Sequence, residues 1–391
     1  MASHFFIKNE RNLFMSKMTE KEKMEKERRK IRKIQNKISD TIPTSVFISD
    51  EEESCWNAVP IGVTADVNEN IIPVYWYLND QNRCERAFDT IPSTSFLICG
   101  TNGSGKTVTE MCVLSHFNRY SNMFQVIGID CKRYEFAGIK DKFTVVLSEP
   151  RSAGEAVTEV QNLMMTRFKL METYAVNNIY KVEAKHIDVP YYVLMGKSYQ
   201  FDEFLPAKID LNKDDREYAK FLELYPDGKK PYTTTIENIY KKLANNDLSC
   251  VYINDNKITA KDIKVTNGTY QVKATVIMID EMTELMCSSD YKAVDMIKSG
   301  LGSIARLGRA VGIHLVLSCQ RASGSTISTD LKNNIQMLCQ LGGFDSGSST
   351  LMFERDISDR ARPNIKGRSF IGNGRNIIET QIYSGEVKRF G

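Results

Sequence analysis

The chain has 391 residues, of which 42% are hydrophobic and 26% charged, as in a globular protein of one large or two ordinary domains. It has no run of 18 or more apolar residues and no apolar leader, so the sequence predicts no membrane contact and no secretory signal. The net charge is only +3, so overall charge alone does not indicate a nucleic-acid binder. The nine cysteines form no zinc-type cluster, which favours free thiols and a cytoplasmic location.

The first 40 residues hold twelve Lys and Arg against six Asp and Glu. Within them, residues 16–39 are rich in helix formers, lack Gly and Pro, and repeat apolar residues at intervals of seven, which predicts one long helix with a thin apolar stripe. We expect this helix to dock on its own domain, the alternatives being contact with a ring partner or with a DNA backbone. Helix and linker make an N-terminal segment over 1–57, and residues 59–78 then predict a β-hairpin.

Strands that are apolar throughout alternate with helices in the main domain, residues 58–391, which predicts an α/β fold with a largely parallel sheet covered on both faces. Residues 186–272 interrupt this order with polar sequence and short strand-like pieces, so we interpret them as an insertion subdomain. The pair Asn267-Gly268 between alternating runs predicts a hairpin turn inside it. We expect strands at 95–100, 125–130, 275–281, 313–320 and 337–343, and helices reaching to 119 and covering about 152–175, 290–309 and 328–335.

A glycine-rich segment follows the first of these strands and opens a helix. It matches the pattern G-x-x-x-x-G-K-[ST], in which backbone N–H groups and the helix N-terminus bind the phosphates of ATP. Lys106 is expected to reach the β- and γ-phosphates, and the Thr107 hydroxyl to bind Mg²⁺. The predicted phosphate loop consists of Gly100, Thr101, Asn102, Gly103, Ser104, Gly105, Lys106 and Thr107.

Two carboxylates, Asp280 and Glu281, follow the apolar strand that begins near residue 275. The carboxyl ends of parallel strands carry the ligand sites of open α/β sheets, so we expect Asp280 in the Mg²⁺ shell and Glu281 as the residue that orients and polarises the attacking water. An Asp-Glu pair also starts helices commonly, but its place on the sheet of the glycine loop favours catalysis. Gln320, at the end of the next strand, is predicted to sense the γ-phosphate, the alternative being a turn residue.

These motifs, in this order, resemble the FtsK/HerA family of ring-forming DNA translocases. The similarity extends to VPIGVTADVNENIIPV before the loop, to IGIDCKRYEF, and above all to ARLGRAVGIHLVLSCQRAS at 305–323. It implies a P-loop NTPase of the RecA-like, additional-strand type with ATP and Mg²⁺ as cofactors. It also implies that Arg309 is a finger that reaches the ATP of the neighbouring subunit in a homo-oligomeric ring, the alternative being a charge that caps a helix C-terminus.

The function predicted from this resemblance is ATP-driven translocation of double-stranded DNA, with Arg321 and Lys332 as pore residues; ordinary surface charge is the alternative for both. A compact motor of this kind suits packaging of a viral genome through a portal into a procapsid, in which case the expected location is the host cytoplasm. A conjugative, plasmid or chromosome-segregation motor is the first alternative. A P-loop ATPase that moves or assembles protein is the second, and the segment from Arg309 to Gln320 argues against it.

Overall fold

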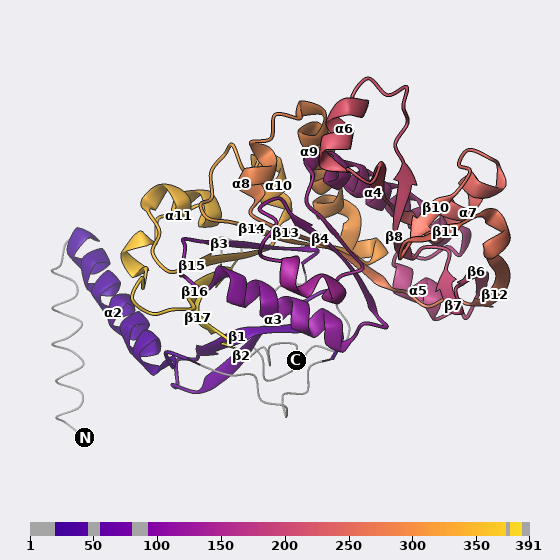
Figure 1. Ribbon diagram of the computed structural model, residues 1–391. Coiled ribbons are helices and arrows are strands. Elements are labelled where there is room, and N and C mark those ends of the chain that lie inside the picture. Colours follow the sequence, from indigo (N-terminus) through magenta and orange to yellow (C-terminus); the bar gives the residue numbers. More distant parts are fainter. Residues whose placement is uncertain (1–19, 46–54, 80–92, 373–375, 385–391) are drawn as a thin grey trace, which may run out of the picture.

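A sheet of ten strands forms the centre of the protein, a computed structural model that describes residues 20–45, 55–79, 93–372 and 376–384. The strand order is β2-β1-β17-β16-β15-β3-β14-β13-β4-β5 (Figure 1). The six strands from β15 to β5 run parallel, and the other four extend the sheet antiparallel. The strands are β1 (Ala58–Ala65), β2 (Ile71–Tyr77), β3 (Ser95–Gly100), β4 (Phe124–Asp130), β5 (Val145–Leu147), β13 (Ala274–Asp280), β14 (Ile313–Cys319), β15 (Met337–Leu341), β16 (Arg368–Gly372) and β17 (Ile377–Ile382).

The parallel half confirms the predicted α/β fold, including a strand, β14, inserted between the strand of the glycine loop and the strand of Asp280. These central strands are buried along their whole length because both faces of the sheet are covered. In β3, for example, Phe96 and Ile98 pack in one core while Leu97 and Cys99 pack in the other.

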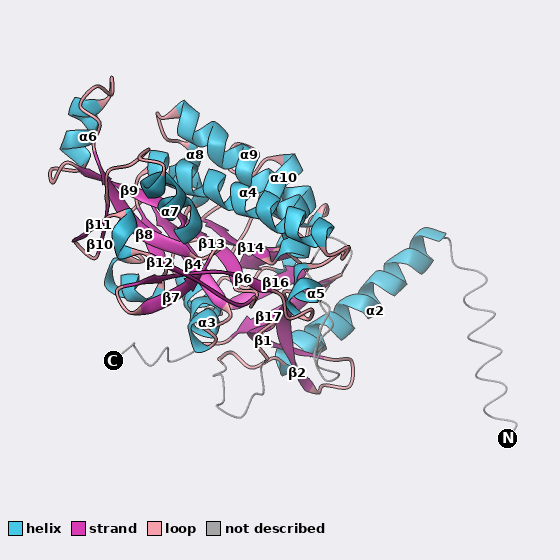
Figure 2. Ribbon diagram, turned by 90° about the vertical axis from the view of Figure 1, so that its right-hand side faces the viewer, coloured by secondary structure: helices cyan, strands magenta, loops and turns pink. Residues whose placement is uncertain are grey.

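Helices cover the two faces separately (Figure 2). Helix α3 contributes Val113, Leu114 and Phe117 to one core, and α4 and α9 line the other. Short helices connect the strands around them. The helices of the main domain are α3 (Lys106–Arg119), η1 (Ala137–Lys142), α4 (Pro150–Thr173), α8 (Met282–Met286), α9 (Tyr291–Leu307), η3 (Gly308–Val311), α10 (Thr329–Asn334), α11 (Ser346–Phe353) and η4 (Ser358–Arg360).

The segment predicted as an insertion builds two small sheets at the β4–β5 side of the main sheet (Figure 1), with orders β12-β6-β7 and β11-β10-β8-β9. Its apolar side chains join the same core as α4 and α9, so it packs on the main domain without a core of its own. Helix α5 (Ile179–Glu183) precedes it. The elements of the insertion are β6 (Asp188–Leu194), β7 (Lys197–Gln200), β8 (Phe204–Asp210), α6 (Tyr218–Leu224), β9 (Lys229–Thr235), α7 (Ile236–Ala244), β10 (Val251–Ile253), β11 (Asn256–Ile258), η2 (Ala260–Asp262) and β12 (Lys264–Thr269).

The predicted hairpin turn at Asn267-Gly268 is wrong. Both residues lie within β12, where they pair with Pro190 and Val189 of β6, and neither adopts the positive φ that a two-residue hairpin turn requires. The glycine serves close packing instead, because a Cβ at Gly268 would lie 2.9 Å from the ring of Tyr191. Cross-strand pairing has therefore overridden the local turn signal.

The predicted N-terminal helix is α2 (Glu20–Thr41); residues 16–19 of the prediction lie outside the described part. It extends from the body of the molecule (Figures 1 and 2) and leaves Met24, Ile31 and Ile34 exposed. Its C-terminal end is anchored at β17, where the Ser39 hydroxyl donates to Glu379 at 2.7 Å. No helix in the described segments is long and apolar enough to cross a membrane.

Candidate nucleotide site and the opposite edge of the sheet

The glycine loop lies where the sequence predicts it, between β3 and α3. Gly103 and Gly105 have φ values of 79° and 109°, which glycine adopts without the cost that other residues incur. The helix begins at Lys106 without a side-chain cap, so its first N–H groups are available to an anion. The loop is also held from its inner side, because the Gly367 N–H donates to the Ser104 carbonyl at 2.9 Å.

Lys106 is the central charge of the site. Its Nζ lies 2.6 Å from Asp280 Oδ1, 3.2 Å from Ser318 Oγ and 3.7 Å from Glu110 Oε1. Burial disfavours the charged ammonium, but the carboxylates of Glu110 and Asp280 outweigh it and raise the pKa of Lys106 above its usual value. The ammonium therefore stays charged and is held where β13, β14 and α3 converge.

Asp280 and Thr107 fit the predicted divalent-cation site. Asp280 is 2% exposed, and its second oxygen, Oδ2, has no hydrogen-bond partner among the described residues. A buried carboxylate oxygen without a donor is one that a cation can satisfy. Thr107, in the first turn of α3, keeps part of its surface exposed to the same edge of the sheet.

Glu281 is held in an unusual backbone conformation. Its φ of 57° and ψ of 75° place a residue with a side chain in the left-handed region, which costs about 1–3 kcal/mol and is found most often at functional sites. The carboxylate is 2% exposed. Its Oε1 accepts from the Gln320 backbone N–H at 3.2 Å, and its Oε2 from Lys132 Nζ at 3.3 Å. The side chain predicted to orient water is thus itself fixed by two donors.

Arg309 lies in η3, just before β14 begins, whereas the glycine loop follows the end of β3. The two strands are parallel neighbours, with Cys99 paired to Cys319. A seven-residue strand spans about 20 Å at roughly 3.3 Å per residue, so Arg309 and the phosphate loop lie at opposite edges of the sheet. With Arg306 and Lys181, Arg309 lines a cavity of about 570 Å³ at that far edge.

The sequence profile of the FtsK/SpoIIIE family matches residues 77–324, more than half of the chain. The chain belongs to the FtsK/SpoIIIE family. The matched stretch includes the phosphate loop, Asp280, Glu281, Arg309 and Gln320.

Two relatives show the extent of the similarity. The DNA translocase FtsK of Rickettsia prowazekii is 26% identical over 243 residues, which are 61% of this chain and 26% of the relative. That of Bradyrhizobium diazoefficiens is 25% identical over 251 residues, 63% of this chain and 24% of the relative. The chain thus spans about a quarter of the length of the curated relatives it matches.

Solved structures share the fold. The pCW3 conjugation coupling protein TcpA, solved with ATPγS, has a TM-score of 0.56 at 19% identity, over 88% of this chain and 70% of TcpA. The second and third ATPases of EssC from Geobacillus thermodenitrificans have a TM-score of 0.54 at 14% identity, over 88% of this chain and 47% of that solved chain. At this level of identity the likeness concerns the P-loop ATPase fold alone.

Three further residues of this FtsK-type site are not among the residues predicted from the sequence. Ser318 links Lys106 to the backbone of Glu281, since its hydroxyl oxygen accepts from Lys106 Nζ at 3.2 Å and from the Glu281 N–H at 3.3 Å. Lys132 reaches Glu281 because Asp130 accepts two backbone N–H groups and shapes the loop after β4. A list of polar residues near the strand ends would include both, but the strand order that brings them to the site is not evident from the sequence.

Glu110 is the third. It follows Lys106 by four residues, a spacing that puts both on one face of α3, and helical spacing alone would have indicated the pair. Its side chain is 1% exposed. Burial raises the pKa of Glu110 to about 8, and the charge of Lys106 only partly offsets this.

The remaining predicted residues lie around the exit of β14. Gln320 is exposed, and it is its backbone N–H that contacts Glu281. Arg321 is also exposed and pairs with Asp345 at 2.8 Å, at the carboxyl edge of the sheet. The Lys332 side chain, only 12% exposed, pairs with Glu354 at 2.8 Å. Of the two predicted pore residues, Arg321 is the more accessible.

Proposed function

We propose that this chain is the ATP-hydrolysing motor unit of a double-stranded DNA translocase that works as a ring. The main observation in favour of ATP hydrolysis is that Lys106, Asp280 and Glu281 lie together at one edge of the sheet, beside the glycine loop. DNA as the substrate is supported by membership of the FtsK/SpoIIIE family and by the names of its relatives.

The residues divide the work of hydrolysis. Backbone N–H groups of the loop and of the first turn of α3 bind the phosphates, and Lys106 exchanges its contact with Asp280 for the β- and γ-phosphates. Thr107 and Asp280 would hold Mg²⁺, which neutralises charge on the phosphates. Glu281, fixed by Lys132 and the Gln320 N–H, orients and polarises the attacking water, while the exposed Gln320 side chain senses the γ-phosphate.

The position of Arg309 supports the proposal of a ring. At about 20 Å from the loop of its own subunit, by strand length, this guanidinium is on the wrong edge to act in cis. In a head-to-tail ring it would face the γ-phosphate of the next subunit, where a finger is worth about 10³–10⁵ in rate. Hydrolysis would then require assembly.

For contact with DNA we propose Arg321 and Lys332, which follow β14 in the chain. The backbone N–H of Gln320, directly after β14, contacts Glu281, so a change in the bound nucleotide could be transmitted through this segment to the DNA phosphates. Such contact is independent of base sequence and weakens with salt. For the task of the motor we propose genome packaging into a procapsid, with the protruding helix α2 and the insertion docking on a portal (Figure 1). Conjugative, plasmid or chromosome-segregation pumping of DNA is the alternative.

DNA-stimulated hydrolysis separates a DNA motor from a P-loop ATPase that moves protein. We expect linear duplex DNA to raise the ATPase rate of the assembled protein, and a rate that DNA leaves unchanged would refute the translocase. Glu281→Gln should retain ATP binding and lose turnover, while Glu284→Gln, an exposed glutamate on α8, serves as the matched control. Purified procapsids that take up DNA with this protein and ATP would support packaging; uptake that does not depend on it would refute that task.

A further inference from the structure

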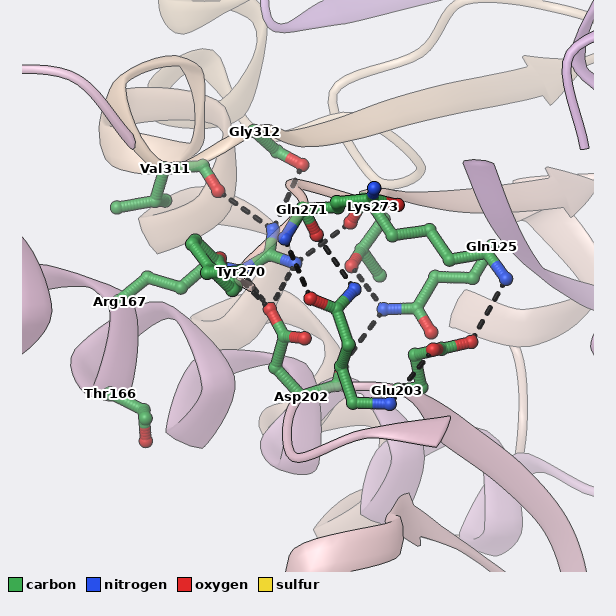
Figure 3. Close-up of polar contacts among 12 residues, drawn as sticks. Gln125, Thr166, Arg167, Asp202, Glu203, Tyr270, Gln271, Lys273, Val311 and Gly312 are labelled. Atoms are coloured by element: carbon green, nitrogen blue, oxygen red, sulfur yellow. Dashed lines mark hydrogen bonds and ion pairs between the residues drawn. The ribbon is translucent and has the colours of Figure 1, made fainter. Parts of the chain in front are cut away.

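A fully buried guanidinium connects the insertion to the segment that carries Arg309. Arg167 lies in α4 with 0% of its side chain exposed, and Figure 3 shows its nitrogen atoms directed at three separate parts of the chain. The Nε and Nη2 atoms of Arg167 donate to Asp202 Oδ2 at 3.1 and 2.8 Å. The remaining hydrogen bonds all go to backbone carbonyls of the main domain.

Those carbonyls belong to two functional elements. The Nη1 atom of Arg167 donates to the Val311 carbonyl at 2.8 Å and to the Gly312 carbonyl at 3.3 Å. These two residues follow Arg309 by two and three positions, so the contacts hold the end of η3. The Nη2 atom of Arg167 donates to the carbonyl of Lys273 at 2.8 Å. Lys273 directly precedes β13, the strand that ends at Asp280. A planar guanidinium holds such acceptors in a fixed relative geometry that an ammonium cannot reproduce.

The insertion reaches the same point through the loop between β7 and β8. Besides Arg167, Asp202 Oδ2 accepts from Tyr270 at 3.1 Å. The side chain of Gln125 in β4 donates to the Asp202 carbonyl at 3.1 Å and to Thr275 in β13 at 2.8 Å. The loop is thereby bound to both strands, as Figure 3 shows for Gln125, Asp202 and their neighbours.

We propose that Arg167 and Asp202 are positioning residues that place the Arg309 turn for action on the neighbouring subunit, so that movement of the insertion is transmitted to that finger. The inference rests on the proposed trans role of Arg309. Beyond that role, it proposes that the insertion influences the rate of ATP hydrolysis in the neighbouring subunit.

Stability alone is a poor explanation for this pair. A buried ion pair often contributes no more to stability than apolar residues of the same volume, because both charges lose their hydration. Here the second oxygen of Asp202, Oδ1, has no hydrogen-bond partner within the part of the chain that the structure describes. What the pair does provide is a fixed distance between the insertion loop, η3 and the start of β13.

The decisive variant is Arg167→Lys, which keeps a cation beside Asp202 but removes the fork that reaches Val311 and Gly312. We expect kcat for ATP to fall about tenfold or more, since a displacement of about 1 Å at a catalytic group can cost about 100-fold. The affinity of the variant for ATP should stay within about twofold of wild type, because its own phosphate loop is at the opposite edge.

Arg151→Lys is the matched control. Arg151 lies on the same helix and also holds a carboxylate with two nitrogen atoms, at 2.7 and 3.0 Å from Asp290, but this pair joins α4 to the start of α9, away from the Arg309 turn. We expect it to leave kcat near the wild-type value. A loss of kcat equal to that of Arg167→Lys would mean that any weakened anchor of α4 has this effect, and would overturn the proposal.

Mixed rings separate positioning in trans from a structural defect. Subunits with Arg167→Lys should regain hydrolysis when mixed with Lys106→Ala subunits, because the latter supply a correctly placed Arg309 to intact ATP sites. If Arg309→Ala is rescued by this mixing and Arg167→Lys is not, the inference fails and the proposed function stands. If Arg309→Ala is not rescued either, the trans role of Arg309 fails as well.

A second variant keeps the proposal testable if Arg167→Lys does not fold. Arg167→Leu combined with Asp202→Leu removes both charges and leaves an apolar contact, which the core can accept. We expect a folded protein that binds ATP, has low kcat, and is rescued in mixed rings. A folded double variant with wild-type kcat would overturn the proposal.

Discussion

The contact between Lys132 and Glu281, the residue proposed to orient the attacking water, provides a sharp test of the site. In Lys132→Met, Glu281 loses the donor at 3.3 Å from Oε2 and keeps only the Gln320 N–H at Oε1. A hydrogen bond to a charged group contributes about 1.5–3 kcal/mol. The bond is long and the Lys132 side chain is 18% exposed, so the lower end of that range applies. About 1.4 kcal/mol corresponds to about tenfold in rate.

We therefore expect kcat for ATP hydrolysis to fall about tenfold, with the affinity for ATP changed less than about twofold, since Lys132 contacts Glu281 and not the glycine loop. Steady-state hydrolysis by the assembled protein and direct nucleotide binding measure the two quantities. Lys140→Met, at an exposed lysine of the neighbouring turn η1, is the control. An unchanged kcat, or a loss that lies entirely in ATP affinity, would refute the role of Lys132.

Three further predictions concern the metal, the buried glutamate and DNA. Asp280→Asn should raise the Mg²⁺ concentration for half-maximal hydrolysis by about tenfold or more, and an unchanged Mg²⁺ titration would remove Asp280 from the metal shell. Burial raises the pKa of Glu110 from 4.5 to about 8, so its contribution to stability is full below about pH 4.5 and is lost as pH rises to about 8. Glu110→Gln should flatten the decline of the urea midpoint between about pH 4.5 and 8, and an unaltered decline would contradict this. Arg321→Ala should reduce the slope of log affinity for duplex DNA against log salt by about 0.9, one phosphate contact, whereas an identical slope would exclude that contact.

The sequence predicts well whatever is encoded in short, local patterns. The phosphate loop, the helix it opens and the strand that ends at Asp280 depend on consecutive residues, and the structure confirms their positions. The parallel order could also be expected from alternating strands and helices. The two-residue turn at Asn267-Gly268 was wrong because its signal, though local, competed with pairing to a strand about 75 residues earlier in the chain.

The contacts inside the site could not be predicted, since they depend on which strands are neighbours. Ser318 meets Lys106 and Glu281 only because β14 lies between β3 and β13, an order that periodicity does not reveal. Lys132 meets Glu281 because β4 is the next strand on the other side. The same holds for Arg167 and Asp202, which lie on a core helix and in the insertion, 35 residues apart.

The insertion and the N-terminal helix α2, the two additions to the core, are each anchored by a buried arginine. Arg167 fastens the insertion, and Arg368, 1% exposed, fastens α2 through Glu379 at 2.9 Å and through the carbonyls of Ser39 and Ile42 at 3.2 and 3.0 Å. Each guanidinium also adjoins a functional element: Arg167 closes the Arg309 turn, and Arg368 directly follows Gly367, whose N–H holds the glycine loop. An apolar contact would attach such an addition with less directional precision than a fork of hydrogen bonds. We therefore expect both additions to be held rigidly at the edges between which the proposed ring would pass the signal of hydrolysis, α2 at the edge of the glycine loop and the insertion at the edge of Arg309.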